Sequence, residues 1–153
     1  MIKSMLEAID NIYTYFTAEI GVGGNLEGIK KIYKGGANPH LILFPCIIIK
    51  PDLEERTVRW AAQAQGTSYE RTFFVLIGVF DQSGDADVAW RTACDYAYKA
   101  MKELETSTDF RSLGYDVSYS GQIEYGTLEF GPDQIFCWGV TIPIQIKVKG
   151  TTS

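Results

Sequence analysis

The chain has 153 residues, a formal net charge of −5 and a hydrophobic fraction of 46%. Its length fits a single domain over residues 1–153, and its acidic balance disfavours broad nucleic-acid binding, which depends on neutralising phosphates with Lys and Arg. Acidic residues interrupt the apolar pattern of residues 1–20, and no apolar run reaches the ~18 residues of a membrane helix, so we expect neither a signal peptide nor a membrane partner.

Residues 2–20 predict a helix, because their apolar side chains recur at spacings of three and four. Residues 21–40 hold six glycines and a basic cluster of Lys30, Lys31 and Lys34. This segment predicts a long flexible loop that contacts a partner. Its GxxxxG spacing lacks the Lys and the Ser or Thr of a phosphate-binding loop.

Three strands are expected next. Residues 41–50 form an apolar run with Pro45 inside it, which predicts an edge strand or a bulge, ended by Pro51 and Asp52. Residues 57–65 give a weaker strand pattern. Residues 69–80 are apolar on both faces, which predicts a strand covered on both faces, one by a helix and the other by the second helix or a neighbouring subunit.

A second helix is expected to start at Asp85 or Asp87, whose carboxylates suit its positive end, and to carry an Ala-rich stripe as far as Leu104. Alternation then predicts a strand from Val117, with a bulge near Gly126 where the phase changes. A turn at 131–134 leads into the long strand 134–149, in which Pro143 predicts an edge side or a bulge. The tail, residues 150–153, is expected to be disordered.

These elements predict an α+β fold with two helices and a largely antiparallel sheet of about five strands, in the order α-β-β-β-α-β-β, ending in a long C-terminal hairpin. The long strand places seven apolar residues on one face, and they should lie under the helices. They are Phe136, Trp138, Val140, Ile142, Ile144, Ile146 and Val148.

No catalytic, cofactor or metal site is expected. The three cysteines, Cys46, Cys94 and Cys137, are widely spaced within apolar runs and predict buried free thiols. His40 is the single histidine, at a loop–strand junction where a surface or capping role is favoured. Carboxylate pairs lie in predicted turns, where acidic residues serve capping and solubility.

The run over residues 71–104, RTFFVLIGVFDQSGDADVAWRTACDYAYKAMKEL, is a two-sided apolar strand that leads through a short Asp/Gly loop into an Ala-rich helix. Together with the preceding helix, the proline-interrupted strand and the final hairpin, it resembles the tail terminator and neck-completion proteins of long-tailed bacteriophages. The resemblance covers most of the chain as a pattern of elements and carries no invariant motif.

This resemblance implies a structural subunit of the virion that assembles in the host cytoplasm into a ring, usually a hexamer. The ring would cap the tail tube protein and join it to the head-side connector protein, and DNA would pass through it without sequence-specific binding. The hairpin and the 21–40 loop would then contact other subunits. The expected interface residues are Lys30, Lys31, Lys34, Pro45, Tyr125 and Pro143.

Three alternatives remain open from the sequence. The chain could be another connector or tail structural protein of a phage. It could be a small α+β adaptor or ligand-binding domain unrelated to phages. It could also be an enzyme with a site assembled from distant residues, which a pocket gathering two titratable groups would reveal.

Overall fold

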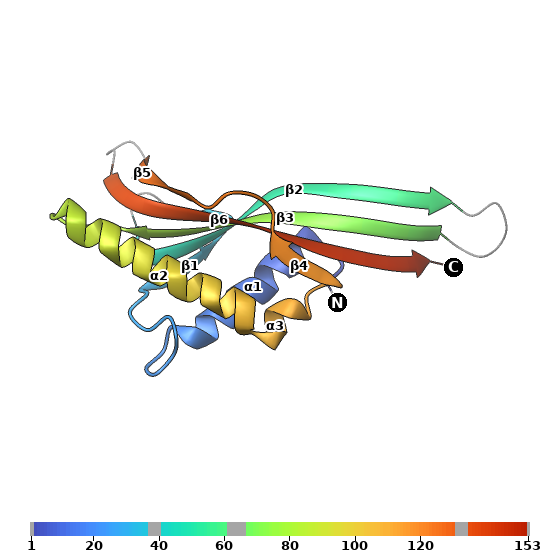
Figure 1. Ribbon diagram of the computed structural model, residues 1–153, viewed down its shortest axis with the longest axis horizontal. Coiled ribbons are helices and arrows are strands. Elements are labelled where there is room, and N and C mark those ends of the chain that lie inside the picture. The colour runs from blue at the N-terminus through green and yellow to red at the C-terminus, as the bar shows by residue number, and fades with distance from the viewer. Residues whose placement is uncertain (1, 37–40, 61–66, 131–134, 153) are drawn as a thin grey trace.

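A computed structural model describes residues 2–36, 41–60, 67–130 and 135–152. The turn predicted at 131–134 and the role of His40 lie outside these residues. Figure 1 shows the helices and strands, whose bounds are as follows: α1 Met5–Glu19, β1 Lys31–Lys34, β2 Cys46–Trp60, β3 Thr67–Asp81, α2 Ala86–Thr106, α3 Thr108–Arg111, β4 Asp116–Tyr119, β5 Glu124–Phe130 and β6 Ile135–Thr152.

The strands form one sheet in the order β1-β2-β3-β6-β4, and β5 also pairs with β6. β1 runs parallel to β2, and every other pair is antiparallel. The α+β class, the largely antiparallel sheet and the C-terminal hairpin are therefore confirmed. The structure adds the short helix α3 and divides the first arm of the hairpin into β4 and β5.

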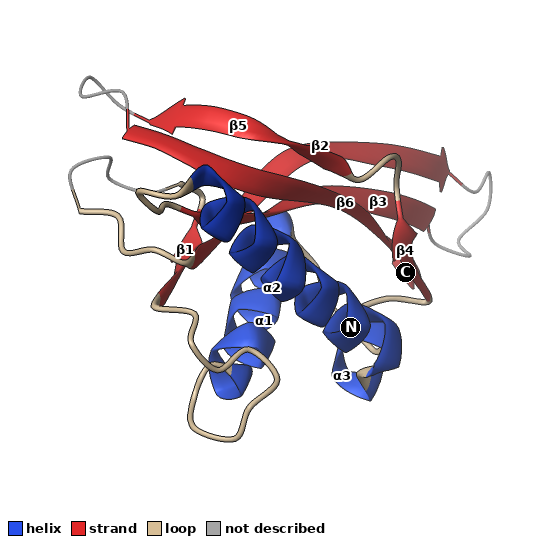
Figure 2. Cartoon of the chain, turned by 60° about the vertical axis from the view of Figure 1, so that its left-hand side comes forward, coloured by secondary structure: helices blue, strands red, loops and turns tan. Residues whose placement is uncertain are grey.

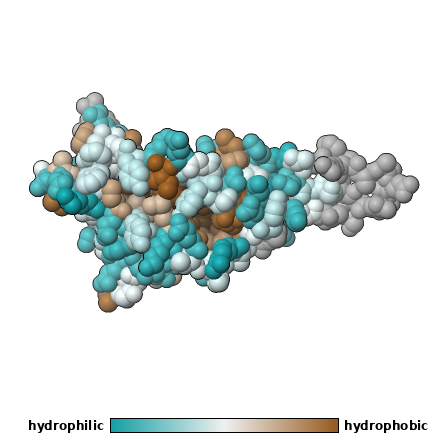
Figure 3. All heavy atoms as spheres, viewed as in Figure 1, coloured by the Kyte–Doolittle hydropathy of each residue, from teal (hydrophilic) through white to brown (hydrophobic). Residues whose placement is uncertain are grey.

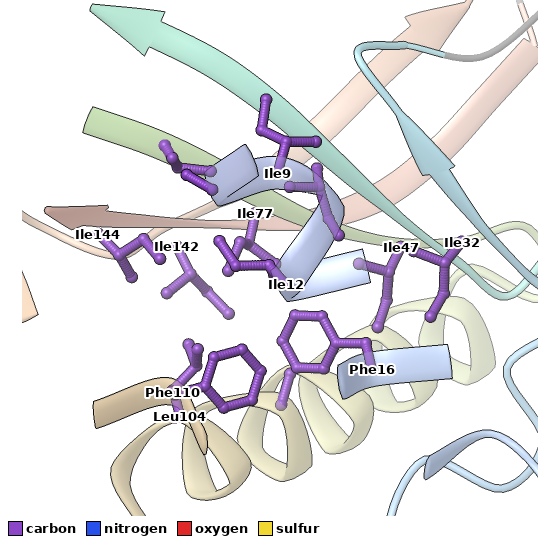
Figure 4. Packing of buried hydrophobic residues seen from close by; sticks show 14 of the residues in the cluster. Ile9, Ile12, Phe16, Ile32, Ile47, Ile77, Leu104, Phe110, Ile142 and Ile144 are labelled. Atoms are coloured by element: carbon purple, nitrogen blue, oxygen red, sulfur yellow. The ribbon is translucent and has the colours of Figure 1, made fainter. Parts of the chain in front are cut away.

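All three helices lie on one face of the sheet (Figure 2). α1 packs against β1 and β2, while α2 packs against β6 and β3. Figure 4 shows Ile12 and Phe16 of α1 facing Ile77 and Ile142 of the sheet. The long strand contributes its predicted apolar side to this core, since Ile142 and Ile144 are almost fully buried, whereas Phe136 at its beginning is half exposed.

Local capping and side-chain size explain where the two long helices lie. Ser4 accepts a hydrogen bond from the backbone N–H of Glu7, and Asp85 accepts one from that of Asp87, which satisfies N–H groups that lack a partner in the first turn. The stripe of α2 toward the sheet is mainly alanine, so the helix approaches the strands closely. Its buried residues are Ala89, Ala93, Ala97, Ala100 and Leu104.

The prediction of one long loop over 21–40 was wrong for part of the segment. Residues 31–34 form β1, which pairs with residues 46–49 at the start of β2. Leu26, Ile29 and Ile32 are buried in the main core. The glycine-rich composition favoured the prediction of a loop. The buried side chains at every third position nevertheless hold the segment against the core.

Proline did not stop the strands where expected. Pro45 precedes β2 and is joined to Phe44 by a cis peptide bond. Pro51 and Asp52 do not end the strand, because β2 continues to Trp60 with a register shift between Pro51 and Leu53. A bulge removes one residue from the ladder and lets the strand continue past a residue that cannot donate.

Two further expectations about the C-terminal part were wrong. β5 keeps one register with β6 through Gly126, so no bulge lies there, and the interruption falls between Tyr119 and Glu124. The tail is not disordered up to Thr152, because residues 150–152 pair with residues 67–69 of β3. Hydrogen bonds to an adjacent strand order a polar tail that has no apolar side chains to bury.

Three strands continue beyond the helices (Figure 1). We call this part the strand extension; it comprises residues 56–60 of β2, 67–71 of β3 and 148–152 of β6, with Arg56 opposite Arg71 and Arg71 opposite Val148. At its base the Arg71 guanidinium donates to the carbonyl oxygen of Lys3 at 2.7 Å, which ties the N-terminal segment to β3.

Candidate interaction surface

The face of the sheet that carries no helix has its own small apolar cluster. Its buried members are Cys46 and Ile48 of β2, Phe80 of β3 and Cys137. Side chains alternate along a strand, so these residues point away from Ile47 and Ile49, which belong to the helix-covered core. Ile42 and Phe44 pack against one end of the cluster, and the remainder of this face carries no secondary-structure element among the described residues.

An open hollow of about 250 Å³ lies on this helix-free face. Of the two leucines that line it, Leu76 is half-buried and Leu128 is 44% exposed. The lining is mainly apolar: Gly35, Gly36, Ile48, Lys50, Leu76, Gly78, Phe80, Leu128 and Thr141. In the view of Figure 3, apolar patches appear toward the middle of the molecule, while mostly hydrophilic residues cover the strand extension.

Two glycines make room for the ring of Phe80, one of the residues that line this hollow. The ring of Phe80 lies over Gly78 on its own strand and over Gly139 on β6, so that a Cβ built on Gly78 would come within 2.5 Å of the ring. The absence of both side chains leaves space for the ring against the backbones of the two strands.

The sheet also has two edges without a strand neighbour among the described residues. β1 covers β2 only as far as Ile49, so residues 53–60 have an open outer side. On the opposite edge β4 covers β6 only as far as Lys147, which leaves residues 148–152 open. Unpaired N–H and C=O groups on such edges can pair with another strand.

The buried titratable groups lie near the end of β3. Burial raises the pKa of the Cys46 thiol to about 12, and the nearby Cys137 and Asp81 add to the shift. Burial, then the charge of Asp81, likewise raises the pKa of Cys137 to about 12. Thiols with such pKa values stay protonated at neutral pH and are poor nucleophiles and metal ligands. All three cysteines are free, as predicted; Cys46 and Cys137 are also buried as predicted, whereas Cys94 on α2 is only half-buried.

A disulfide between these two cysteines does not fit the register. Cys46 lies opposite Phe80, and Phe80 lies opposite Gly139, so two strand spacings of ~4.8 Å separate Cys46 from β6. That separation exceeds the ~7 Å limit between Cα atoms in a disulfide.

Burial also raises the pKa of Asp81, while hydrogen bonds from the Gln82 backbone and the Thr92 side chain act in the opposite direction. The described residues contain no group of three or more potential metal-ligating side chains.

The basic residues expected at an interface lie on and beside β1. Lys34 forms an ion pair with Asp10 of α1 at 3.2 Å and stands over the ring of Tyr13, so its charge is engaged within the subunit. Lys30 and Lys31 are exposed, and Lys31 lies 5.5 Å from the ring centroid of Tyr33 on the helix-free face.

The other expected interface residues are spread over the sheet. The carbonyl oxygen of Pro45 accepts the backbone N–H of Lys30 at 2.8 Å, which places these two residues side by side. Tyr125 is exposed on β5 at the opposite edge, and Pro143 is half-buried within β6. The six residues therefore do not form one site.

Sequence reasoning missed the helix-free hollow. It expected a cover on both faces of β3 and left open whether the second cover was a helix or a neighbour. The available signal was the pair Gly78 and Gly139, because glycine inside a strand marks a close approach of another group. The open edges depend on which strands are neighbours, which no local pattern gives.

Fold and surface together define a single-sheet α+β domain with one helix-covered face and one open face. No protein-family model matches the chain, and no curated protein matches it. Within the described residues, no helix combines the length and apolar character needed to span a membrane.

Proposed function

We propose that the chain is a structural subunit of a phage neck, a tail terminator that assembles as a ring on the tail tube and joins it to the head-side connector. The supporting observation is the helix-free face, where an apolar hollow with exposed Leu128 and a half-buried Leu76 remains open in the single chain. A neighbouring protein that covers this hollow would remove its apolar surface from water.

Shape and charge also support an assembly role. The strand extension projects past the helices (Figure 1) and offers backbone groups on both outer edges. A head-to-tail contact closes into a ring when its rotation divides a full turn. With a net charge of −5, such a ring would bind DNA phosphates weakly and let DNA pass without sequence readout.

The test is the mass of the purified protein alone and after mixing with purified tail tubes. We expect a closed oligomer of about six copies, or binding of such an oligomer to tube ends. Leu128→Asp should weaken this assembly, because it places a charge in the hollow. Leu6→Asp is the matched control, since Leu6 is exposed on α1 on the other face of the sheet. A protein that stays monomeric with tail tubes present refutes the proposal.

A further inference from the structure

At the end of the sheet away from the strand extension, the outermost strands are β1 and β5 (Figure 1). Neither has a described strand on its outer side. The pairings place the two strands at the same level: Lys31 lies opposite Cys46, Cys46 opposite Phe80, Phe80 opposite Gly139, and Gly139 opposite Gly126. One row across the sheet therefore begins in β1 and ends in β5.

The outer edge of β5 presents a defined set of backbone groups. The N–H of Ser120 donates to the carbonyl oxygen of Pro143, so the backbone of Pro143 points away from β3. Backbone direction alternates along an antiparallel strand, so Gly139 points the same way and its partner Gly126 points back to it. The N–H and C=O groups that point outward from β5 therefore belong to Tyr125, Thr127 and Glu129.

The outer edge of β1 presents a shorter set. The N–H of Gly35 donates to the carbonyl oxygen of Ile49 at 2.7 Å, so the backbone of Gly35 points to β2. Alternation along the strand then turns the N–H and C=O groups of Ile32 and Lys34 outward. The side chain of Lys34 is held by Asp10, but its backbone groups have no described strand beside them.

β1 is parallel to β2, and each step from β2 through β3 and β6 to β5 is antiparallel, so β1 and β5 run in opposite directions. The β5 edge of one copy can therefore meet the β1 edge of a second copy that has the same orientation. This contact joins two different surfaces, so it is head-to-tail and repeats from copy to copy. From these edges we infer that neighbouring copies of the chain join their sheets by antiparallel pairing of β5 with β1.

Side-chain shape selects the register of this contact. Gly126 lies opposite Tyr33 of the next copy, because a Cβ built on Gly126 meets nothing within 4 Å and an aromatic ring has room there. Both Tyr33 and Leu128 lie on the helix-free face, so the ring also packs beside Leu128. Within one chain Gly126 is level with Lys31, so this register staggers the copies by two residues, as a sheet that closes on itself requires. The hydrogen-bonded pairs are then Thr127 with Ile32 and Tyr125 with Lys34.

Neighbouring segments leave the two edges accessible. β4 lies in line with β5 along β6, since β5 pairs with residues 135–141 and β4 with residues 144–147. The hydroxyl of Tyr33 donates to the carbonyl oxygen of Leu41 at 3.2 Å and accepts from the N–H of Leu43 at 2.9 Å. These bonds hold the segment that follows β1 on the helix-free face of the sheet.

The helices also have room in this arrangement. α1 packs on β1 and β2, and α2 packs on β6 and β3. With a strand spacing of ~4.8 Å, α1 of the next copy would lie about 14 Å from α2. Packed helices are ~8–10 Å apart, so the two helices do not collide. The side chain of Tyr125, which is exposed on the helix side of β5, can fill the remaining space.

Charge favours this contact over pairing between identical edges. Lys30 and Lys31 are exposed at the start of β1, and Glu124 and Glu129 are exposed on β5. No described residue forms an ion pair with any of them. In the chosen register Glu129 lies opposite Lys30 of the next copy. Two β5 edges would instead bring carboxylates together and two β1 edges ammonium groups, and like charges across a contact oppose association.

This contact rests on the proposed function in taking a second copy as the neighbour. The first experiment measures oligomer formation against protein concentration, with and without tail tubes, for Thr127→Pro and Thr127→Ala. Proline removes an N–H that points away from β6, so the fold should persist, while its ring obstructs a strand on the outer side. Thr127→Pro should raise the concentration needed for half-assembly on the order of tenfold, and Thr127→Ala should change it less than about twofold. Thermal unfolding checks that both variants are folded.

The second experiment tests the register by mild oxidation and needs no proline variant. In a Cys94→Ala background, Tyr125→Cys combined with Lys34→Cys should give covalent multimers, since the Cα atoms of such a pair lie ~5.5 Å apart. Glu124→Cys combined with Lys34→Cys is the control, because Glu124 is exposed on the other face of β5. The two buried cysteines stay in place.

Each outcome separates the contact from the proposed function. Equal assembly of Thr127→Pro and Thr127→Ala, or multimers formed equally by the two cysteine pairs, overturns the β5–β1 contact and leaves the ring proposal standing. Covalent dimers of Thr127→Cys alone would mean that two β5 edges pair, which overturns the head-to-tail arrangement. Multimers with the expected cross-link that do not bind tail tubes support the contact and contradict the proposed function. A parent protein that stays monomeric with tail tubes overturns both proposals.

Discussion

The backbone N–H of Ser120 donates to the carbonyl oxygen of Pro143 at 3.0 Å, where β6 passes from its pairing with β5 to its pairing with β4. Pro143 lacks an N–H, and its missing donor points to the same side as its carbonyl. It thus faces Ser120, in the connection between Tyr119 and Glu124 that belongs to neither β4 nor β5. A proline therefore sits inside the longest strand without leaving a β3 carbonyl unpaired.

Ile144→Ala should lower the free energy of unfolding by about 2–5 kcal/mol, because Ile144 is almost fully buried beneath the helices and its loss leaves a cavity. Urea denaturation of the purified protein measures the change. Leu53→Ala, at a half-exposed position on β2, is the control and should cost far less. An effect below about 0.5 kcal/mol for Ile144→Ala would mean that the faces of β6 are assigned wrongly.

Gly139→Ala should cost about 1–3 kcal/mol, since the added methyl group collides with the ring of Phe80 and forces it to move. Gly126→Ala on the paired strand β5 is the matched control, because a Cβ there meets nothing within 4 Å. Thermal unfolding gives both values. Adding Phe80→Leu to Gly139→Ala should recover part of the loss, and full additivity of the two changes would contradict the predicted contact.

Stability should fall with rising pH above the ordinary thiol pKa of 9.0, because burial raises the pKa of Cys46 and Cys137 to about 12 in the folded chain. The unfolded chain releases these protons first, so the contribution is complete below pH 9.0 and is lost as pH rises toward about 12. The Cys46→Ala, Cys137→Ala double variant should show a shallower fall between pH 7 and about pH 10.5 by urea denaturation. Equal slopes for parent and variant would argue that the thiols are not buried.

Tyr119→Phe should cost about 1 kcal/mol, because the Tyr119 hydroxyl donates to the Glu105 carboxylate at 2.7 Å and joins β4 to the end of α2. Burial, followed by this hydrogen bond, also raises the pKa of Tyr119. Tyr125→Phe, at an exposed position on β5, should change stability by less than about 0.5 kcal/mol. Similar losses of stability in the two variants would contradict a stabilising contribution from the hydrogen bond between Tyr119 and Glu105.

Periodicity located the long elements because each has one continuous apolar face. Helix α1 and the Ala-rich α2 lie within a few residues of the expected ranges, and Asp85 caps α2 as one of the two predicted starts. The alternation from Trp138 to Val148 correctly separated the core side of β6 from its other side. Such faces are local properties of the sequence, so local patterns recover them.

The features that the sequence did not predict are those that depend on pairing between strands. β1 has four residues, and its strand geometry comes from lying beside residues 46–49 of β2. Residues 150–152 are ordered by β3. The bulge after Pro51 keeps β2 in the sheet although two residues there are poor strand formers. Each of these depends on a partner distant in sequence.

The candidate surface was likewise predicted only as far as local patterns allow. The two-sided apolar character of β3 predicted a second cover, yet the pattern could not say that α1 and α2 would share one face and leave the other open. Among the expected interface residues, Lys34 is held by Asp10, a contact between segments that only the fold brings together.

Strand β3 runs without a register break along β6 from Thr67 to Asp81, so the strand extension and the helix-covered core share one continuous ladder. Displacing the tip of β3 relative to the core would shear hydrogen bonds that also hold Phe73, Val75 and Ile77 under the helices. We therefore expect the extension to move together with the helix-covered core and not to bend at its base. A force applied by a neighbouring molecule at the end of the extension would be transmitted along β3 to the part of the sheet beneath the helices.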